Sequence, residues 1–340
     1  MGALDDVALA ANVSRSTAAR VLADRGYTSS AARKRVLEAA QLVGYTPNGI
    51  AKRLRLQRSM TIGLIVANVQ NSYYALIARG VEQTARMRGY QTVLANSDDD
   101  PDVERRYLEL FAETRVEGIV AAPSRRTAAA KAYADAVDRG IAVVTVDTAV
   151  PGAKLDHVEV DNLASARDAV SSLIEAGHTR IAALVDVALG GAVAERVKGY
   201  RRALRSAGLV PAEGYELRVP RSRDYSERDL EPIVRLLLRD DGPTAVFATT
   251  NSMSAQLVRA LTLAGLRCPE DVSLIGFDDA PWMSFFPTPI TAVQQPTLAM
   301  AQTATALLLD RVEGISASSP TRVTMATDLI RRQSIAPPRA

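Results

Sequence analysis

Residues 61–277 repeat one unit, a short apolar run followed by an amphipathic helical stretch. The first run, Thr61–Ala67, is continuous and rich in β-branched residues, which is typical of a strand buried on both faces of a parallel sheet. Such alternation predicts doubly wound α/β sheets. Several helical stretches end at a glycine followed by a residue that packs back, as at a left-handed helix end: Gly140-Ile141, Gly177-His178, Gly208-Leu209 and Gly265-Leu266.

The repeats locate most of the elements. The pattern restarts near Asn162, so we expect two sheets, one in each of two lobes. The expected strands are Thr61–Ala67, Gln91–Ala95, Gly118–Ala122, Ala142–Asp147, Ile181–Val185, Ala245–Thr249 and Val272–Phe277. The expected helices are Ser72–Arg88, Asp102–Arg115, Thr127–Arg139, Leu163–Ala176, Val193–Ala207, Ser226–Arg239, Ser252–Ala264 and Leu298–Val312.

The first 45 residues predict a separate helical head. A short apolar stripe ends at Asn12, and Ser14 can cap a second helix that begins with polar and basic residues. A third helix, Ala31–Val43, has four expected inward residues: Val36, Leu37, Ala40 and Val43. Two helices joined by a tight turn indicate a helix-turn-helix, which places the start of the second helix in the DNA major groove. A generic three-helix bundle is the alternative.

Charge is distributed unevenly along the chain. Residues 1–58 contain ten basic and four acidic residues, a formal charge of +6, whereas the whole chain carries +3. The remaining residues therefore carry −3. A basic head on a slightly acidic body is typical of nucleic-acid binding, and a solvated basic surface is the alternative.

Residues 47–58 predict a short helix that orders on DNA. Pro47 prevents the third helix from continuing, and Asn48 can cap a new helix, Asn48–Leu56. This helix has too little apolar surface to be stable alone. Its cations suit phosphates, and Leu54 is free to wedge between base steps. A plain charged linker is the alternative.

Several motifs together resemble the lac-repressor (LacI/GalR) family of bacterial transcription regulators, and the resemblance covers nearly the whole chain. The motifs are Asp6-Val7-Ala8, Val13-Ser14, Thr17, Arg20-Val21-Leu22, Gly44-Tyr45-Thr46-Pro47-Asn48 and Ala51-Lys52-Arg53-Leu54-Arg55. The resemblance implies a helix-turn-helix head (1–46), a hinge helix and linker (47–60) and a periplasmic-binding-protein-like body. The body would have an N-terminal lobe (61–161 plus 291–324) and a C-terminal lobe (162–290 plus 325–340), with crossings near Asp161, Ile290 and Thr324.

For the DNA site, we expect base-edge contacts from Arg15, Ser16 and Arg20, with Arg20 suited to guanine. Phosphate contacts are expected from Ser14, Thr17, Asn48 and Lys52, and Ala51 and Arg55 complete the hinge surface. Two heads of a homodimer would bind a pseudo-palindromic operator. The resemblance implies that paired Leu54 side chains enter a central C-G step.

For the effector site, the resemblance implies a cleft between the lobes at the carboxyl ends of the strands. The expected effector-binding residues are Tyr73, Tyr74, Asp147, Arg196, Asn251, Asp278 and Trp282. Arg196 would clamp the ligand, Asp278 would accept from ligand hydroxyls, and Trp282 would stack on a sugar face. The alternatives are a structural Asp278–Arg196 ion pair, lobe packing or dimer contact for Tyr73 and Tyr74, and plain hydrophobic packing for Trp282.

Two departures from the family pattern bear on the ligand. Many members carry Asn-Asp where this chain has Thr250-Asn251, so an acceptor is replaced by an amide that also donates. The loop Val187–Ala192 lacks the basic and hydroxyl residues expected for a purine corepressor. The first departure would retune the recognition of a polyol, and the second favours a neutral sugar or polyol, which could act as inducer or corepressor.

Other functions find less support. A transport sugar-binding protein would have a secretion signal and no basic head, and both expectations disagree with this sequence. An enzyme on this fold would have a catalytic constellation or a glycine-rich phosphate loop after the first strand, where this chain has Asn68–Asn71. Asp98–Asp100 is expected to be a solvated loop that caps the next helix, and His178 to be structural. We expect no cofactor, no metal and no membrane span. We expect a dimer, because apolar heptads are absent at the C-terminus. We expect the protein in the bacterial cytoplasm, associated with the nucleoid.

Overall fold

The computed structural model describes residues 4–22, 27–45, 58–124, 130–187, 190–220, 226–315 and 319–339. The chain forms two compact units, Met1–Ser59 and Met60–Ala340. The expected hinge helix, with Asn48, Ala51, Lys52, Leu54 and Arg55, lies outside the described residues.

The first unit contains three described helices, α1 (Leu4–Ala10), α2 (Arg15–Leu22) and α3 (Ser30–Leu42). Their inward faces form one small core, with Val7, Ala18, Val21 and Val36 buried. The expectation for Leu37 is wrong, because its side chain is 46% exposed. At 3.6 residues per turn, Val36, Ala39 and Ala40 occupy the inward face of α3, and Leu37 falls outside it.

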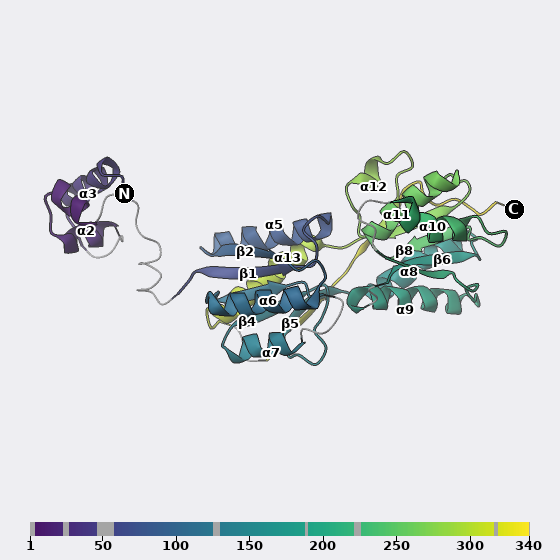
Figure 1. The fold of residues 1–340 in the computed structure, drawn as a ribbon, viewed down its shortest axis with the longest axis horizontal. Helices are drawn as coiled ribbons and strands as arrows, with labels where there is room; N and C mark the ends of the chain where they lie inside the picture. Colours follow the sequence, from purple (N-terminus) through teal and green to yellow (C-terminus); the bar gives the residue numbers. More distant parts are fainter. Residues whose placement is uncertain are drawn as a thin grey trace. The chain divides into compact units, whose positions relative to one another are not determined.

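The first sheet of the body has six parallel strands. In chain order they are β1 (Thr61–Val66), β2 (Gln91–Asn96), β3 (Gly118–Ala121), β4 (Ala142–Val146), β5 (Asp156–Val160) and β11 (Arg322–Met325). Their spatial order is β11-β5-β4-β3-β1-β2. Helices α5 (Ser72–Met87) and α13 (Thr297–Val312) cover one face, and α6 (Pro101–Glu113) and α7 (Ala130–Asp138) cover the other (Figure 1).

The second sheet repeats this arrangement. Its strands are β6 (Ile181–Asp186), β7 (Glu216–Val219), β8 (Ala245–Ala248), β9 (Ser273–Phe277), β10 (Thr291–Gln294) and β12 (Asp328–Ile330), in the order β12-β10-β9-β8-β6-β7. Only β12 runs antiparallel to its neighbour. Helices α8 (Asn162–Glu175) and α9 (Gly191–Ser206) pack on one face, α10 (Glu227–Leu237) and α11 (Asn251–Ala264) on the other, and α12 (Trp282–Phe285) is short.

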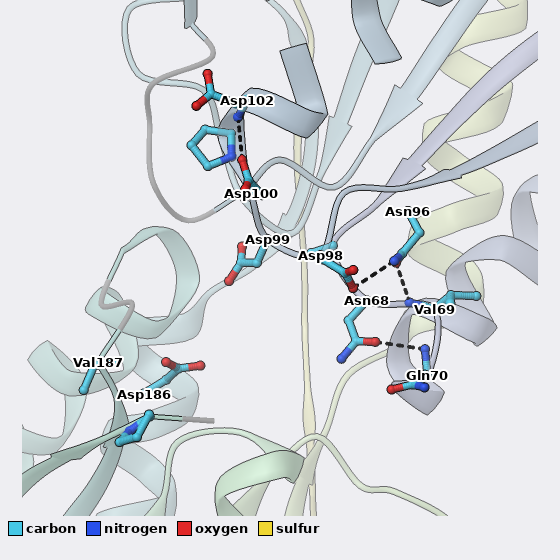
Figure 2. A pocket seen from close by; sticks show the side chains of 13 residues that line it. Asn68, Val69, Gln70, Asn96, Asp98, Asp99, Asp100, Asp102, Asp186 and Val187 are labelled. Atoms are coloured by element: carbon cyan, nitrogen blue, oxygen red, sulfur yellow. Dashed lines mark hydrogen bonds between the residues drawn. The ribbon is translucent and has the colours of Figure 1, made fainter. Parts of the chain in front are cut away.

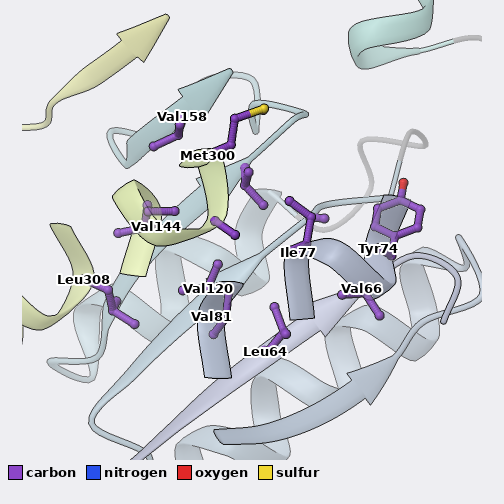
Figure 3. Close-up of a cluster of buried hydrophobic side chains, with 14 of the residues drawn as sticks. Leu64, Val66, Tyr74, Ile77, Val81, Val120, Val144, Val158, Met300 and Leu308 are labelled. Atoms are coloured by element: carbon purple, nitrogen blue, oxygen red, sulfur yellow. The ribbon is translucent and has the colours of Figure 1, made fainter. Parts of the chain in front are cut away.

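The central strands are buried on both faces, which explains why their sequences are continuous apolar runs. In β1, Leu64 and Val66 enter the cluster beneath α5 and α13, whereas Ile65 enters the cluster on the opposite face. Figure 3 shows the first cluster, where Ile77 and Val81 of α5 meet the sheet. The seven strands expected from apolar runs are present, each within two residues of its expected ends. Five short outer or late strands escaped prediction because they lack such runs: β5, β7, β10, β11 and β12.

The chain crosses between the lobes three times. It leaves β5 of the first sheet and enters α8 of the second lobe at Asp161. The second crossing follows Gln294, not Ile290, because β10 pairs with β9 and therefore belongs to the second sheet. The third lies between Met325, which pairs with Val160 in the first sheet, and β12 of the second. The second and third lobe boundaries therefore lie after Gln294 and after Met325, a few residues beyond the expected positions 290/291 and 324/325.

Two expectations of structural roles for polar residues are confirmed. Asp100 caps α6, accepting from the backbone N–H of Asp102 over 2.8 Å and of Val103 over 3.2 Å. His178 is buried, with Nδ1 2.9 Å from Thr244 Oγ1 and Nε2 2.9 Å from the Ala336 carbonyl. His178 thus anchors the C-terminal segment to the second lobe.

Candidate functional site

The exposed start of α2 is organised by Ser14. Its Oγ accepts from the backbone N–H of Thr17 over 3.2 Å and lies 2.9 Å from Ser16 Oγ and 2.8 Å from Thr17 Oγ1. The helix follows a turn at Asn12, whose φ of 50° is left-handed, a conformation that asparagine tolerates better than most residues. Ser14 therefore caps α2 as the sequence predicted, and the turn presents the helix start to solvent.

The two arginines of α2 differ in their surroundings. Arg15 Nη1 lies 3.3 Å from Asp5 of α1 in an exposed ion pair, a contact that the sequence analysis missed. Arg20 is exposed on the same helix, and its Nη2 donates to Thr17 Oγ1 over 3.4 Å. The structure thus brings the five head residues expected to contact DNA onto one short segment: Ser14, Arg15, Ser16, Thr17 and Arg20.

In the body, Arg196 of α9 is the centre of a buried polar cluster. Its side chain is 3% exposed. Nε donates to Asn162 Oδ1 over 2.8 Å, and Nη1 donates to the Thr249 carbonyl over 3.0 Å. The guanidinium also lies 3.7 Å from the centroid of the Phe277 ring, a cation–π geometry. Arg196 is therefore held rigidly by groups of the second lobe.

Two aspartates, one from each lobe, face Arg196. Asp278 follows β9 and accepts from Arg196 Nη1 over 3.4 Å, while Asp147 follows β4 and lies 3.8 Å from Arg196 Nη2. Both have left-handed φ angles, 68° for Asp147 and 69° for Asp278. This conformation costs about 1–3 kcal/mol for a residue other than glycine and is concentrated at functional sites. Both carboxylates lie beside the Arg196 guanidinium, one from each lobe.

Tyr73 and Tyr74, at the start of α5, form the wall from the first lobe. Both are buried, with ring centroids 5.2 Å apart in an edge-to-face arrangement. Tyr73 Oη makes no hydrogen bond to any residue that the structure describes. Burial, and next the negative charges of Asp147 and Asp278, hold the pKa of Tyr73 well above its usual range. The hydroxyl is thus kept neutral in a cavity that both carboxylates also line.

These five residues line one small cavity of about 10 Å³, together with Asn71, Ala192, Val193 and Thr250. That volume holds about one water molecule, whereas small-molecule sites usually span about 300–1,000 Å³. A ligand of sugar size therefore requires the lobes to separate or the side chains to move.

Asn251 and Trp282, also expected in the effector site, do not line this cavity. Trp282 lies at the start of α12 and packs on the second-lobe core, edge-to-face with Phe286 at 6.1 Å. Asn251 bonds instead to Asn71 of the first lobe, with amide contacts of 2.8 and 3.1 Å.

Three polar residues of this region were missed from sequence. Asn71 caps α5 by accepting from Tyr73 N over 3.0 Å. Gln295, at the second crossing, donates from Nε2 to Asp278 Oδ1 over 2.6 Å. Asn162, at the first crossing, accepts from Arg196. An asparagine before a helical stretch is a capping signal that could have indicated Asn71, but no sequence signal marks Gln295.

A larger pocket of about 650 Å³ lies between the strand ends of the two lobes. The loop Asn68–Gln70 and the segment Asn96–Asp102 line it from the first lobe, and Asp186, Val187 and Pro220 from the second (Figure 2). In Figure 2, Asn96 bonds to both Asp98 and the Val69 backbone, which ties the two first-lobe loops together. The loop after β1 therefore contributes to both the pocket and, through Asn71, the small cavity.

The described residues contain no group of three or more His, Cys, Asp or Glu side chains placed to hold a metal ion. Within the same part of the chain, no helix is both long and apolar enough to cross a membrane.

A helix-turn-helix head and a two-lobed body with a polar site between the lobes define the class of DNA-binding regulators built on a periplasmic-binding-protein-like fold. Comparisons with known proteins agree with this class. Residues 3–48 match the model of "Bacterial regulatory proteins, lacI family", and residues 170–335 match "Periplasmic binding protein-like domain". The chain belongs to the lacI family of bacterial regulatory proteins.

Individual relatives cover almost the whole chain. Catabolite control protein A of Priestia megaterium is 32% identical over 307 residues, covering 89% of this chain and 90% of that protein. The structure of the transcriptional regulator CelR–cellobiose complex is 32% identical, with a TM-score of 0.71, and covers 98% of this chain and 100% of that one. The lac repressor dimer bound to operator and the anti-inducer ONPF has a TM-score of 0.83 at 21% identity, over 98% of this chain and 99% of that one, and so shows the fold.

Proposed function

We propose that this protein is a dimeric transcriptional repressor whose affinity for operator DNA is switched by a neutral sugar or polyol bound between its two lobes. Membership of the lacI family and the capped, exposed start of α2 support the DNA-binding part. The convergence of Asp147, Arg196 and Asp278 beside the hydroxyl of Tyr73 supports the effector part. Such a repressor acts in the cytoplasm, where the DNA is, and needs no catalytic residue.

On DNA, we propose direct base contacts from Arg15, Ser16 and Arg20. Ser14 and Thr17 are engaged with each other and with the backbone of α2, which suits them to positioning the helix on phosphates. The hinge residues Asn48, Ala51, Lys52 and Arg55 would add backbone contacts, and paired Leu54 side chains would enter the central C-G step of a pseudo-palindrome.

Arg20→Ala is expected to weaken binding to the selected operator by about 1–3 kcal/mol, because a bidentate arginine–guanine contact is lost. Selection of binding sequences from a random DNA pool, followed by anisotropy titration, measures both preference and affinity. One position in each half-site should lose its preference.

Arg35→Ala is the matched control for Arg20→Ala. Arg35 is exposed on α3, so this variant removes the same charge from the head without touching α2. It should slightly weaken binding to all DNA sequences and leave the preferred sequence unchanged. Equal loss of preference in both variants would contradict base reading by Arg20, and a pool that yields no preferred sequence would contradict the DNA-binding proposal.

The charges of the small cavity indicate the chemistry of the effector. Two carboxylates accept hydrogen bonds and one guanidinium donates them, a set that suits several neighbouring hydroxyl groups. The observation that carries this proposal is the Tyr73 hydroxyl, which is buried, neutral and without a hydrogen bond among the described residues. A buried hydroxyl without a partner costs free energy that a ligand hydroxyl would recover.

Asp278→Ala is expected to weaken sugar binding by about 1.5–3 kcal/mol while leaving operator binding intact, because a charged acceptor is removed from the body alone. A panel of pentoses, hexoses and disaccharides, scanned by thermal shift, first identifies a ligand of the parent protein. Titration of that ligand into both proteins then measures the loss. A variant that binds the ligand with parental affinity would mean that the site is misplaced.

The same contacts give a route from ligand to lobe movement. Arg196 bonds to Asn162 at the first crossing, and Asp278 bonds to Gln295 at the second. A ligand that engages Arg196 and Asp278 therefore acts on side chains tied to two of the three connections between lobes. It can shift the open–closed equilibrium only by its differential affinity for the two states.

A further inference from the structure

Asn71 and Asn251 come from opposite lobes and form a reciprocal amide pair. Asn71 Nδ2 donates to Asn251 Oδ1 over 3.1 Å, and Asn251 Nδ2 donates to Asn71 Oδ1 over 2.8 Å. Asn71 precedes α5 of the first lobe, and Asn251 is the first residue of α11 of the second. The pair therefore joins the lobes directly beside the small polar cavity, which Asn71 also lines.

The pair requires an amide on both sides. Each side chain presents one donor and one acceptor to the other, and Asn71 Oδ1 also accepts from the backbone N–H of Tyr73. Asn251 is 7% exposed, so water competes poorly for its amide. A carboxylate at either position could accept but not donate, and it would place two acceptor oxygens against each other.

Arg196 and Asp147 also approach each other across the cleft, with a longer separation than the amide pair. Arg196 Nη2 and Asp147 Oδ1 are 3.8 Å apart, beyond hydrogen-bond distance. Because the small cavity beside the pair measures only about 10 Å³, separation of the lobes is one way to admit a sugar to it. The Asn71–Asn251 bonds would then break on entry and form again on closure.

We infer that Asn71 and Asn251 are an interlobe latch, and that residue 251 controls the effector response through lobe closure, not through ligand contact. This inference rests on the proposed function in one respect, that the lobes open and close around an effector. The latch stabilises the closed lobes by two hydrogen bonds, so its strength sets the fraction of protein competent to hold a ligand.

The test compares lobe separation in full-length protein without any added ligand. Exposed positions Ala134 of α7 and Arg202 of α9 are changed to cysteine and spin-labelled, in a Cys268→Ser background. The labelled chain is diluted with unlabelled chain so that distances within one protomer dominate. Double electron–electron resonance then reports the populations of short and long interlobe distances.

Asn251→Asp is expected to raise the ratio of open to closed lobes about tenfold, because one hydrogen bond is lost and two acceptors meet. The change suits the start of α11, where a helix dipole favours a carboxylate. Asn71→Asp should act in the same direction while still capping α5, since aspartate caps as well as asparagine. Both variants should therefore fold, which far-ultraviolet circular dichroism verifies.

Gln302→Glu is the matched control. It makes the same change from amide to carboxylate in the first lobe, at an exposed position of α13 that lines neither pocket. Its distance distribution should equal that of the parent. If Asn251→Asp and Asn71→Asp also equal the parent, the latch does not hold the lobes.

A sugar titration of the parent separates this result from the proposed function. If the variants have the parent's distances and the parent binds a sugar, the latch proposal is contradicted and the proposed effector site stands. If the variants change the distances and the parent binds no sugar of the panel, the latch proposal is supported and the proposed ligand class is contradicted.

Discussion

Arg196→Ala is expected to destabilise the body by about 3–5 kcal/mol, the usual effect of removing one partner from a buried charged cluster. The change leaves Asp147 and Asp278 without the cation between them. It also removes the donors to Asn162 Oδ1 and the Thr249 carbonyl, and the stacking on Phe277. Urea unfolding of the full chain, followed by far-ultraviolet circular dichroism, measures this loss.

Arg202→Ala is the control for this prediction. Arg202 lies on the same helix, α9, and is exposed, so its replacement removes an equal charge and side-chain length. It should change the unfolding free energy by less than about 0.5 kcal/mol. If Arg196→Ala also lowers the unfolding free energy by less than about 0.5 kcal/mol, the cluster is solvated and does not organise the cleft.

Gly199→Val is expected to cost about 3 kcal/mol, because α8 and α9 pack through this glycine. A Cβ at position 199 would lie 2.4 Å from the Leu163 carbonyl oxygen and 2.9 Å from Arg167 N, both backbone atoms that cannot rotate away. Separating the two helices would also stretch the 2.8 Å bond between Arg196 and Asn162. The variant should therefore weaken sugar binding in addition to stability.

Lys198→Ala tests whether this effect is specific to the helix contact. Lys198 is the preceding residue and is exposed, and it forms a surface ion pair with Glu195, so its loss should cost under about 1 kcal/mol. Unfolding midpoints of the two variants in urea give the comparison. In an uncrowded helix, replacing glycine gains stability, so a stabilised Gly199→Val protein would show that the helices do not meet there.

Much of the polar cluster between the lobes could be predicted from sequence because its residues lie where strands end. Asp147 follows β4 and Asp278 follows β9, and parallel strands that end at one edge bring such residues together. Tyr73 and Arg196 came from the family resemblance, and the structure places all four around one cavity. The left-handed backbone of the two aspartates had no sequence signal, since glycine or asparagine is the usual occupant.

Asn251 and Trp282 were expected in the same cluster, but they do not line the small cavity. Both residues follow the end of a strand in the sequence, and this position predicted that their side chains lie in the cleft. Trp282 begins a short helix and packs against Phe286, a choice set by the shape of the second-lobe core. Asn251 bonds with Asn71, 180 residues away in sequence, which no local pattern encodes.

By itself, the sequence determined most of the helices, the buried central strands and the class of this protein. Buried parallel strands must be continuous apolar runs, helix ends need glycines and caps, and a capped basic helix after a tight turn suits DNA. These are local requirements, each met within a few residues. Only the tertiary structure decided that β10 belongs to the second sheet, that Arg196 is tied to the first crossing, and that Asn71 meets Asn251 between the lobes. Such pairings depend on how distant segments pack, and the free energy that selects them belongs to the whole fold.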